Sequence, residues 1–150
     1  MHGSFRPGAV RLMYCVALFA VCAAQAAAAD FTIAPNISGG FGNFRWDVAI
    51  GSAGAVGNPD LTLYTGQTYT FQVNTNGVHP FWIKTSPGTG TLNGYMGTGL
   101  SANGVAAATT ITFTVPNNAP DTLYYNCGNH PEMQGIINII IDQLFANGFE

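Results

Sequence analysis

The sequence predicts an all-β protein, a β-sandwich of about seven to eight short strands. Apolar and polar residues alternate over short stretches, which is the pattern of strands with one buried face. Glycine and proline, 19 and 8 of the 150 residues, separate these stretches at short spacing, and no stretch has the period of a helix. Hydrophobic residues make up 47% of the chain, so one domain of this length can bury a core.

The charge of the chain excludes one class of partner. Only 7% of the residues are charged, and four Lys and Arg stand against seven Asp and Glu, which gives a formal net charge of −3. A nucleic-acid-binding protein needs a stripe of basic side chains that neutralises phosphates. No nucleic-acid partner is therefore expected.

Residues 1–29 are predicted to be a signal peptide. Arg6 and Arg11 give the positive start, an apolar run follows, and small residues end it. We expect cleavage after Ala29, with Ala26 as the alternative site. The apolar run is short for a membrane span, so no stable membrane insertion is expected after cleavage. The mature protein is predicted to be periplasmic or secreted.

Five strands are predicted in the first half of the single domain, which spans residues 30–141. Each has apolar residues at alternate positions or β-branched and aromatic residues between turn signals. These strands cover residues 31–33, 44–50, 61–64, 68–73 and 78–84. The second is the clearest, because it places four apolar side chains on one face: Phe44, Trp46, Val48 and Ile50. Residues 51–60 are rich in Gly, Ala, Asn and Pro and predict a loop.

Three further strands are predicted, at residues 109–115, 122–127 and 136–141. The first alternates Thr with apolar residues, and the second places Leu123, Tyr125 and Cys127 on one face. The third is almost entirely aliphatic, which predicts a strand covered on both sides. Residues 85–108 contain six glycines and no strand pattern, so they predict a long loop. Residues 142–150 form a C-terminal tail beyond the last strand.

The side chains that bind soft metals are scarce after the leader, and most of them gather in one place. Cys127 is the one cysteine of the mature chain, and it lies with His130 and Met133 within seven residues, between two predicted strands. His79, the other histidine, lies 48 residues earlier, at the start of a predicted strand. Loops at one end of a sandwich converge, so these residues can meet. A lone cysteine in an exported protein requires intermolecular pairing, burial or a metal.

These four side chains make a ligand set that suits copper. Two imidazoles and a thiolate form a trigonal set, and a thioether adds a weak fourth ligand. Soft sulfur ligands hold Cu(I) and imidazoles suit Cu(II), whereas zinc rarely takes methionine. We predict one copper ion bound by His79, Cys127, His130 and Met133. Met96, in the long loop, is the alternative thioether.

The run from Tyr125 to Gly135, together with His79, resembles the ligand segments of the cupredoxins, the small type 1 blue copper proteins. The Cys-x2-His-x2-Met spacing, with Pro131 after the histidine, is most similar to the ligand loop of amicyanin, whereas plastocyanin and pseudoazurin have a longer gap before the methionine. The resemblance covers roughly residues 59–141. It departs at Pro80, which has no N–H, where the family commonly has an asparagine that donates to the cysteine sulfur.

This resemblance implies a Greek-key sandwich with His79, Cys127 and His130 as equatorial ligands and Met133 as the axial ligand. It implies a monomer that carries single electrons between transient redox partner proteins. His130 is the expected electron port, inside an apolar rim of Pro80, Phe81 and Pro131.

Two other functions remain open from the sequence. A copper storage, delivery or resistance protein would use the same ligands, and a secreted β-sandwich binding module would use no metal. An enzyme is not expected, because a multicopper oxidase needs several domains and His-x-His motifs, and the sequence has no such motif.

Overall fold

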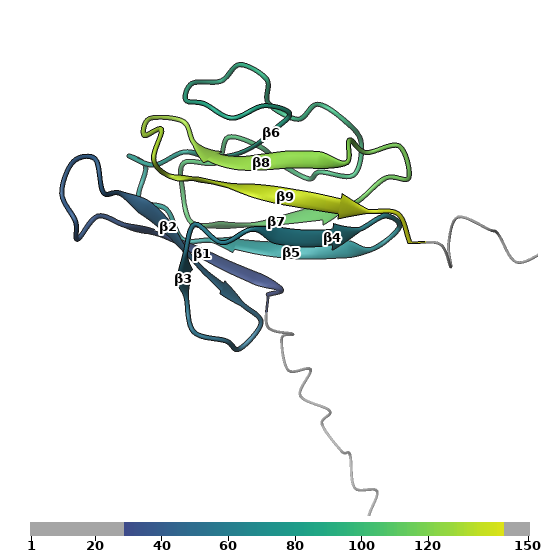
Figure 1. The fold of residues 1–150 in the computed structure, drawn as a ribbon, viewed down its shortest axis with the longest axis horizontal. Helices are drawn as coiled ribbons and strands as arrows, with labels where there is room; N and C mark the ends of the chain where they lie inside the picture. The colour runs from purple at the N-terminus through teal and green to yellow at the C-terminus, as the bar shows by residue number, and fades with distance from the viewer. Residues whose placement is uncertain (1–28, 143–150) are drawn as a thin grey trace, which may run out of the picture.

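The computed structural model describes residues 29–142, which form two β-sheets packed face to face (Figure 1). One sheet has five strands in the order β3-β2-β1-β5-β7, and the other has four in the order β4-β9-β8-β6. The strands are β1 (Phe31–Asn36), β2 (Arg45–Ile50), β3 (Val56–Gly57), β4 (Leu61–Tyr64), β5 (Thr68–Val73), β6 (Phe81–Lys84), β7 (Thr109–Thr114), β8 (Thr122–Cys127) and β9 (Gln134–Ile140). These residues include no helix long and apolar enough to cross a membrane.

The predicted all-β sandwich is thereby confirmed. Strands β1 with β5 and β4 with β9 pair in parallel, and the remaining pairs are antiparallel. The predicted signal peptide, except for Ala29, and the predicted tail, except for Asp142, lie outside the described residues. The leader and the domain boundaries therefore stay predictions.

All eight predicted strands are present, three of them (β4, β5 and β8) with the predicted ends and five with shifted ends, and β3 is additional. It lies inside the predicted loop 51–60, where Val56 and Gly57 pair with Val48 and Asp47 of β2. Both residues of β3 are exposed, and so short a strand produces no alternating pattern in the sequence. The prediction of an unbroken loop was therefore wrong at these two positions.

Strand β6 begins at Phe81, later than the predicted start at Val78. Pro80 has no N–H for a ladder hydrogen bond, so the strand begins after it. His79 consequently lies in the connection between β5 and β6. There the Thr75 hydroxyl donates to the His79 carbonyl at 2.6 Å. A histidine held in a connection can turn its ring towards the end of the sandwich.

Strand β9 is covered on one side, so the prediction of two covered faces was wrong. Ile137 and Ile139 are buried, whereas Ile140 and Ile141 are 45% and 54% exposed. The aliphatic run reflects an inner position in the sheet, with β4 on one edge and β8 on the other. Both edges of the strand are paired although one of its faces meets solvent.

The core lies between the two sheets and is built from the inward side chains of both. The largest of its fully buried side chains include Trp46, Tyr125, Phe71, Phe81 and Phe113. Aromatic rings meet across the core: Phe81 packs on Trp46 with ring centroids 5.5 Å apart and on Tyr125 at 6.1 Å. Phe81 pairs with Cys127 in the β6–β8 ladder. This aromatic group therefore supports the end of β8, where Cys127 lies.

Residues 85–108 form the predicted long connection, and they cover the outer edge of β6. Phe81 and Val105 exchange two backbone hydrogen bonds, of 2.8 and 3.1 Å. The Asn103 side chain accepts from the Ile83 N–H and donates to the Ile83 carbonyl, both at 2.8 Å. An uncovered edge strand is a template for aggregation, so this segment protects the sheet that carries the ligand loop.

Candidate metal centre

The ligand loop, residues 127–133, is a tight connection between β8 and β9. The Cys127 N–H donates to the Met133 carbonyl at 2.8 Å, and the Met133 N–H donates to the His130 carbonyl at 3.3 Å. Below the loop, Tyr125 pairs with Gly135 across the two strands. The loop is thus closed on itself, with Cys127 and His130 on its inner side.

The segment that carries His79 is tied to the first half of this loop. The Gly128 N–H donates to the Pro80 carbonyl at 2.8 Å, and the Asn129 side-chain amide donates to the Val78 carbonyl at 2.7 Å. These two bonds flank His79 in the sequence. They bring His79 beside a loop that lies 48 residues further along the chain.

Three of the four predicted ligands meet at this end of the sandwich. His79 Nδ1 lies 3.1 Å from His130 Nδ1, and Cys127 Sγ lies 3.8 Å and 3.5 Å from these two nitrogens. Cys127 is fully buried, His79 is 3% exposed and His130 is half-buried. Among residues 29–142, this is the one group of His, Cys, Asp and Glu side chains that could hold a metal ion.

The donor atoms have the spacing that one metal ion requires. Bonds of about 2.0 Å to nitrogen and about 2.3 Å to sulfur, at trigonal angles, separate two nitrogens by about 3.5 Å and a nitrogen from sulfur by about 3.7 Å. The observed separations of 3.1, 3.5 and 3.8 Å are close to these values. Two Nδ1 atoms and a sulfur are also the donor chemistry that copper accepts. The residues present therefore fit a copper ion.

Burial changes the protonation of two of these groups. It lowers the pKa of His79, and the neighbouring His130 lowers it further, so the neutral imidazole is favoured. Burial raises the pKa of the Cys127 thiol, and the Asn129 N–H, 3.4 Å from the sulfur, partly offsets this effect. Neutral imidazoles are the form that ligates metals. A thiolate at this buried position is stabilised by a cation beside it.

Aromatic side chains enclose the histidine pair. The Phe44 ring meets the His130 and His79 rings edge-on, with centroids 5.0 and 5.9 Å apart, and Trp46 meets His79 in the same manner at 6.4 Å. Phe41 packs on the outer side of Phe44 at 5.4 Å. The alternating pattern of the second predicted strand marked Phe44 and Trp46 as core residues. It contained no signal that they contact the metal-binding group.

Three other predictions about the site have different outcomes. Met133 is fully buried in the ligand loop, and its assignment as the axial ligand stays a prediction. Met96 is 92% exposed, which does not fit a ligand of a buried centre. Phe81 is fully buried, so its predicted place in a surface rim was wrong. It is a core residue because the first position of β6 points inward.

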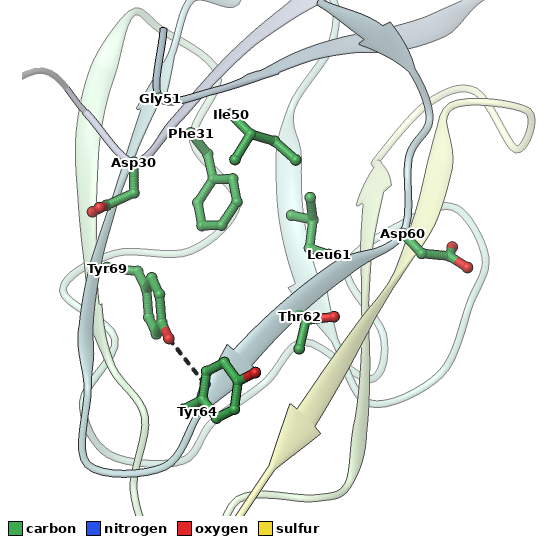
Figure 2. Close-up of a pocket in the computed structure, with 9 residues that line it drawn as sticks. All are labelled: Asp30, Phe31, Ile50, Gly51, Asp60, Leu61, Thr62, Tyr64 and Tyr69. Atoms are coloured by element: carbon green, nitrogen blue, oxygen red, sulfur yellow. Dashed lines mark hydrogen bonds between the residues drawn. The ribbon is translucent and has the colours of Figure 1, made fainter. Parts of the chain in front are cut away.

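A separate hollow of about 520 Å³ lies between the edge strand β4 and the neighbouring sheet (Figure 2). Its lining residues are Asp30, Phe31, Ile50, Gly51, Asp60, Leu61, Thr62, Tyr64 and Tyr69. The Tyr69 hydroxyl accepts a hydrogen bond from the Tyr64 N–H at 3.0 Å. This hollow includes none of the predicted metal ligands, so the two features are distinct.

Comparisons with known proteins found likenesses among solved structures alone. No protein-family model and no curated protein matches the chain. Rusticyanin from Thiobacillus ferrooxidans is 22% identical, with 73% of this chain and 75% of that chain covered and a TM-score of 0.45. A purple cupredoxin from Nitrosopumilus maritimus is 15% identical, with 75% and 99% covered and a TM-score of 0.42.

A variant of the multicopper oxidase McoA from Aquifex aeolicus is 18% identical, with 78% of this chain but 27% of the oxidase covered and a TM-score of 0.41. Because these TM-scores are below 0.5, the likenesses do not bear on function, which is inferred from this chain's own residues. The cupredoxin resemblance predicted from the sequence is confirmed in one respect: His79, Cys127 and His130 gather at one end of an all-β sandwich.

Proposed function

We propose that this chain is an exported type 1 copper protein, periplasmic or secreted, that carries single electrons between redox partner proteins. Three equatorial ligands, His79, Cys127 and His130, would hold one copper ion, with Met133 as the axial ligand. The observation that carries this proposal is the convergence of two Nδ1 atoms and one sulfur within 4.8 Å of one another. A single donor group suits a carrier better than an enzyme.

Copper held by this donor set would supply a one-electron Cu(II)/Cu(I) couple, and with it the chain could accept an electron from a reduced donor protein and pass it to an oxidised acceptor. The chain contributes a rigid site, because hydrogen bonds within the loop and to Val78 and Pro80 fix the donor positions. A site that changes little between two oxidation states passes electrons with little rearrangement. The rigid attachment of the donor residues thus favours an electron carrier over a protein that delivers its copper to another protein.

The exposure of the ligands indicates the route of the electron. His79 and Cys127 are buried, so the protein excludes water from their side of the centre. His130 is half-buried, beside the exposed Pro131 and the half-buried Pro80. We assign His130 as the electron port, with these two prolines as apolar surface for a transient partner. Small interfaces of this kind suit brief encounters between redox proteins.

A copper titration of the exported protein tests the proposal. We expect one Cu(II) per chain, an intense blue absorption band, narrow copper hyperfine splitting by EPR and a reversible one-electron potential. Cys127→Ser should abolish the blue band, because the thiolate is its source. Pale copper spectra in the wild type, or a blue band that survives Cys127→Ser, would contradict the proposed site.

The axial assignment and the role as a carrier have their own controls. Met133→Leu should shift the potential and the spectrum, whereas the matched variant Met96→Leu should leave both unchanged because Met96 is exposed. A blue protein that gives its copper to an apo-acceptor on mixing, without a reversible potential, would favour copper delivery. Equal behaviour of the two methionine variants would overturn Met133 as the axial ligand.

A further inference from the structure

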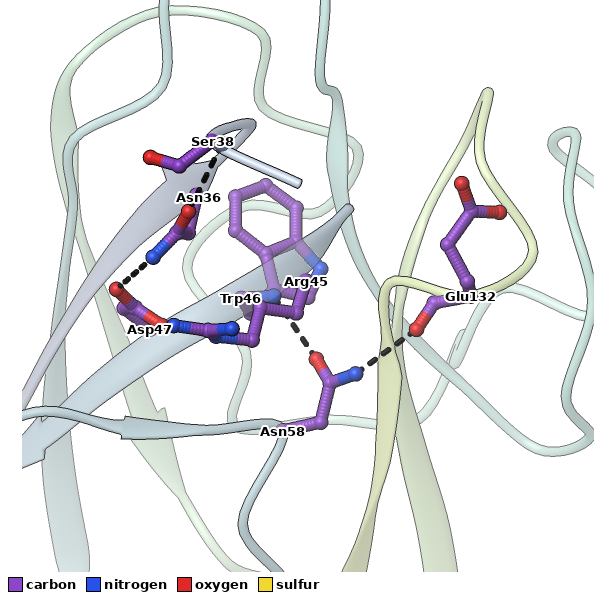
Figure 3. Close-up of polar contacts among 7 residues, drawn as sticks. All are labelled: Asn36, Ser38, Arg45, Trp46, Asp47, Asn58 and Glu132. Carbon is purple, nitrogen blue, oxygen red and sulfur yellow. Dashed lines mark hydrogen bonds and ion pairs between the residues drawn. The ribbon is translucent and has the colours of Figure 1, made fainter. Parts of the chain in front are cut away.

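Asn58, in the short connection between β3 and β4, joins the second half of the ligand loop to β2 (Figure 3). Its side-chain oxygen Oδ1 accepts the Trp46 N–H at 2.8 Å. Its side-chain nitrogen Nδ2 donates to the Glu132 carbonyl, also at 2.8 Å. Its backbone N–H donates to the Trp46 carbonyl at 2.7 Å. The side chain thus bridges Trp46, which lies 12 residues before Asn58 in the sequence, and Glu132, which lies 74 residues after it.

The two halves of the ligand loop are anchored by different parts of the chain. The first half is tied to the segment before β6 by Gly128 and Asn129, as described above. In the second half, the Glu132 carbonyl belongs to the same peptide unit as the Met133 N–H, and it is the group that Asn58 holds. Within the described residues, the other backbone hydrogen bonds of residues 130–132 stay inside the loop.

The peptide units on both sides of Met133 are therefore fixed. The carbonyl before it is held by Asn58, and its own N–H and carbonyl are held by His130 and Cys127. Without the bond from Asn58, the second half of the loop is closed on itself but not attached from outside. The position of Met133 relative to the sandwich then depends on packing and on the bond from the Cys127 N–H at the end of β8.

Two features fit Asn58 to this task. Its φ is 45°, in the left-handed region that asparagine tolerates better than most residues. Because Oδ1 is engaged by the Trp46 N–H, the amide is oriented with Nδ2 towards Glu132. The Trp46 ring also packs against His79, with centroids 6.4 Å apart. Asn58 thereby connects both sides of the donor group.

The strand that supports Asn58 is itself braced. Asp47 accepts a hydrogen bond from the Asn36 side chain at 2.7 Å and another from Arg45 Nε at 2.8 Å (Figure 3). Arg45 and Asp47 lie on either side of Trp46 in β2. The Asn36 oxygen in turn accepts the Ser38 N–H at 3.0 Å. This group holds the β1–β2 hairpin on which the Trp46 backbone lies. The anchor of Asn58 is thus a rigid one.

We propose that Asn58 is a positioning residue that sets the place of Met133 in the metal centre. Its effect on the loop is independent of copper, and its effect on the metal rests on the proposed function. Asn58→Asp keeps the Oδ1 acceptor and the tolerance of a left-handed backbone, but it places a carboxylate oxygen against the Glu132 carbonyl. The variant therefore replaces the attachment by repulsion.

Amide hydrogen exchange in the metal-free protein tests the attachment. In Asn58→Asp, the Met133 and Cys127 amides should exchange about tenfold faster or more, as expected on loss of one hydrogen bond. The Phe71 amide, in the centre of β5, should exchange as in the wild type. Asn93→Asp is the matched control. Asn93 also has a left-handed φ, of 58°, but it is exposed and lies in the long connection 85–108, outside the ligand loop.

Copper-loaded protein gives the second readout. Asn58→Asp should bind one copper with its potential and spectrum shifted in the same direction as those of Met133→Leu, and Asn93→Asp should match the wild type. Asn58→Gly, which keeps the left-handed backbone and removes both side-chain bonds, should repeat the exchange result if the aspartate variant does not fold. Wild-type exchange in both Asn58 variants would overturn the proposal, whatever the copper spectra show. Faster exchange in the Asn58 variants, together with a wild-type protein that binds no copper, would leave the attachment standing and refute the proposed function alone.

Discussion

The interior of the sandwich and its metal-binding end are held together by different contacts. In the interior, inward side chains from both sheets, such as Leu63 and Phe71, are fully buried against one another. At the metal-binding end, side-chain groups of Thr75, Asn58 and Asn129 hydrogen-bond to backbone carbonyls of neighbouring segments. Burial of apolar surface is non-directional, whereas each hydrogen bond fixes an orientation.

This difference separates two properties of the molecule. Most of the free energy of unfolding should come from the interior, because full burial of one large side chain contributes about 1.5–3 kcal/mol. The geometry of the donor atoms should come from the metal-binding end, where single hydrogen bonds contribute about 1 kcal/mol each. Interior variants should therefore change stability without changing the metal spectrum.

The largest effect is expected from Leu63→Ala. Leu63 is fully buried in β4 and pairs with Ile139 of β9. Its truncation should lower the free energy of unfolding by about 2–5 kcal/mol, because it removes buried methyl groups and leaves a cavity. Urea denaturation measures this loss, and the visible spectrum of the folded, copper-loaded variant should equal that of the wild type.

Thr62→Ala is the matched control for this variant. Thr62 is the preceding residue of the same strand and is exposed, so its truncation should change stability by no more than about 0.5 kcal/mol. A changed copper spectrum in Leu63→Ala, or an equal loss of stability in the two variants, would contradict the view that the interior sets stability and the metal-binding end sets the donor geometry.

A smaller effect on stability is expected from Lys84, a buried lysine between the interior of the sandwich and the ligand loop. Its Nζ donates to the carbonyls of Gly88, Thr89 and Gly90, at 2.6, 3.2 and 3.0 Å. The Gly90 N–H donates to the carbonyl of Gly128 in the ligand loop. Burial lowers the pKa of Lys84 below its ordinary value. The unfolded chain therefore binds more protons at this residue than the native protein does, between the lowered pKa and about 10.4.

The stability contributed by Lys84 should consequently rise with pH in that interval. Wild type and Lys84→Met should be unfolded in urea at several pH values from neutral to alkaline. The stability of the wild type relative to the variant is expected to increase as pH rises, because the titration of Tyr125 and of other groups cancels in the difference. A difference that stays level or falls would show that the three carbonyls offset the burial of the charge.

Much of this organisation could be predicted from the sequence, because it depends on local patterns. The strand at 44–50 was visible in the alternation of Phe44, Trp46, Val48 and Ile50, and β2 covers most of that range. The clustering of Cys127 and His130 followed from their spacing in one loop. His79 was predicted from its scarcity, and the structure places it at the same point.

The remaining features depend on contacts between distant residues that leave no local pattern. In the sequence, Asn58 is indistinguishable from any loop asparagine, because the residue that it holds, Glu132, lies 74 residues further along the chain. Lys84 was one of two basic residues after the leader, and nothing in its neighbourhood in the sequence indicated that it is buried. Val56 and Gly57 form a strand because β2 lies beside them, not because of their own propensity.

The smallest effect is expected from Phe44, whose ring covers the histidine pair. Phe44→Leu keeps most of the apolar surface but removes the edge-on ring contacts with His130 and His79. Such contacts contribute about 0.5–1.5 kcal/mol beyond burial, so a loss of about 1 kcal/mol is expected in urea denaturation. Phe41→Leu is the control, because Phe41 is 90% exposed and its ring contacts Phe44 but neither histidine.

The two phenylalanine variants also compare contacts of one chemical kind at different distances from the metal-binding group. Phe41→Leu should cost less than about 0.5 kcal/mol and leave the copper spectrum unchanged. Phe44→Leu should shift the copper spectrum, because both imidazole rings lose their edge-on contact with the Phe44 ring. If neither variant shifts the spectrum, Phe44 does not orient the histidine rings. The metal-binding end would then be organised by the hydrogen bonds of Thr75, Asn129 and the loop and by the contact of Trp46 with His79, without a contribution from Phe44.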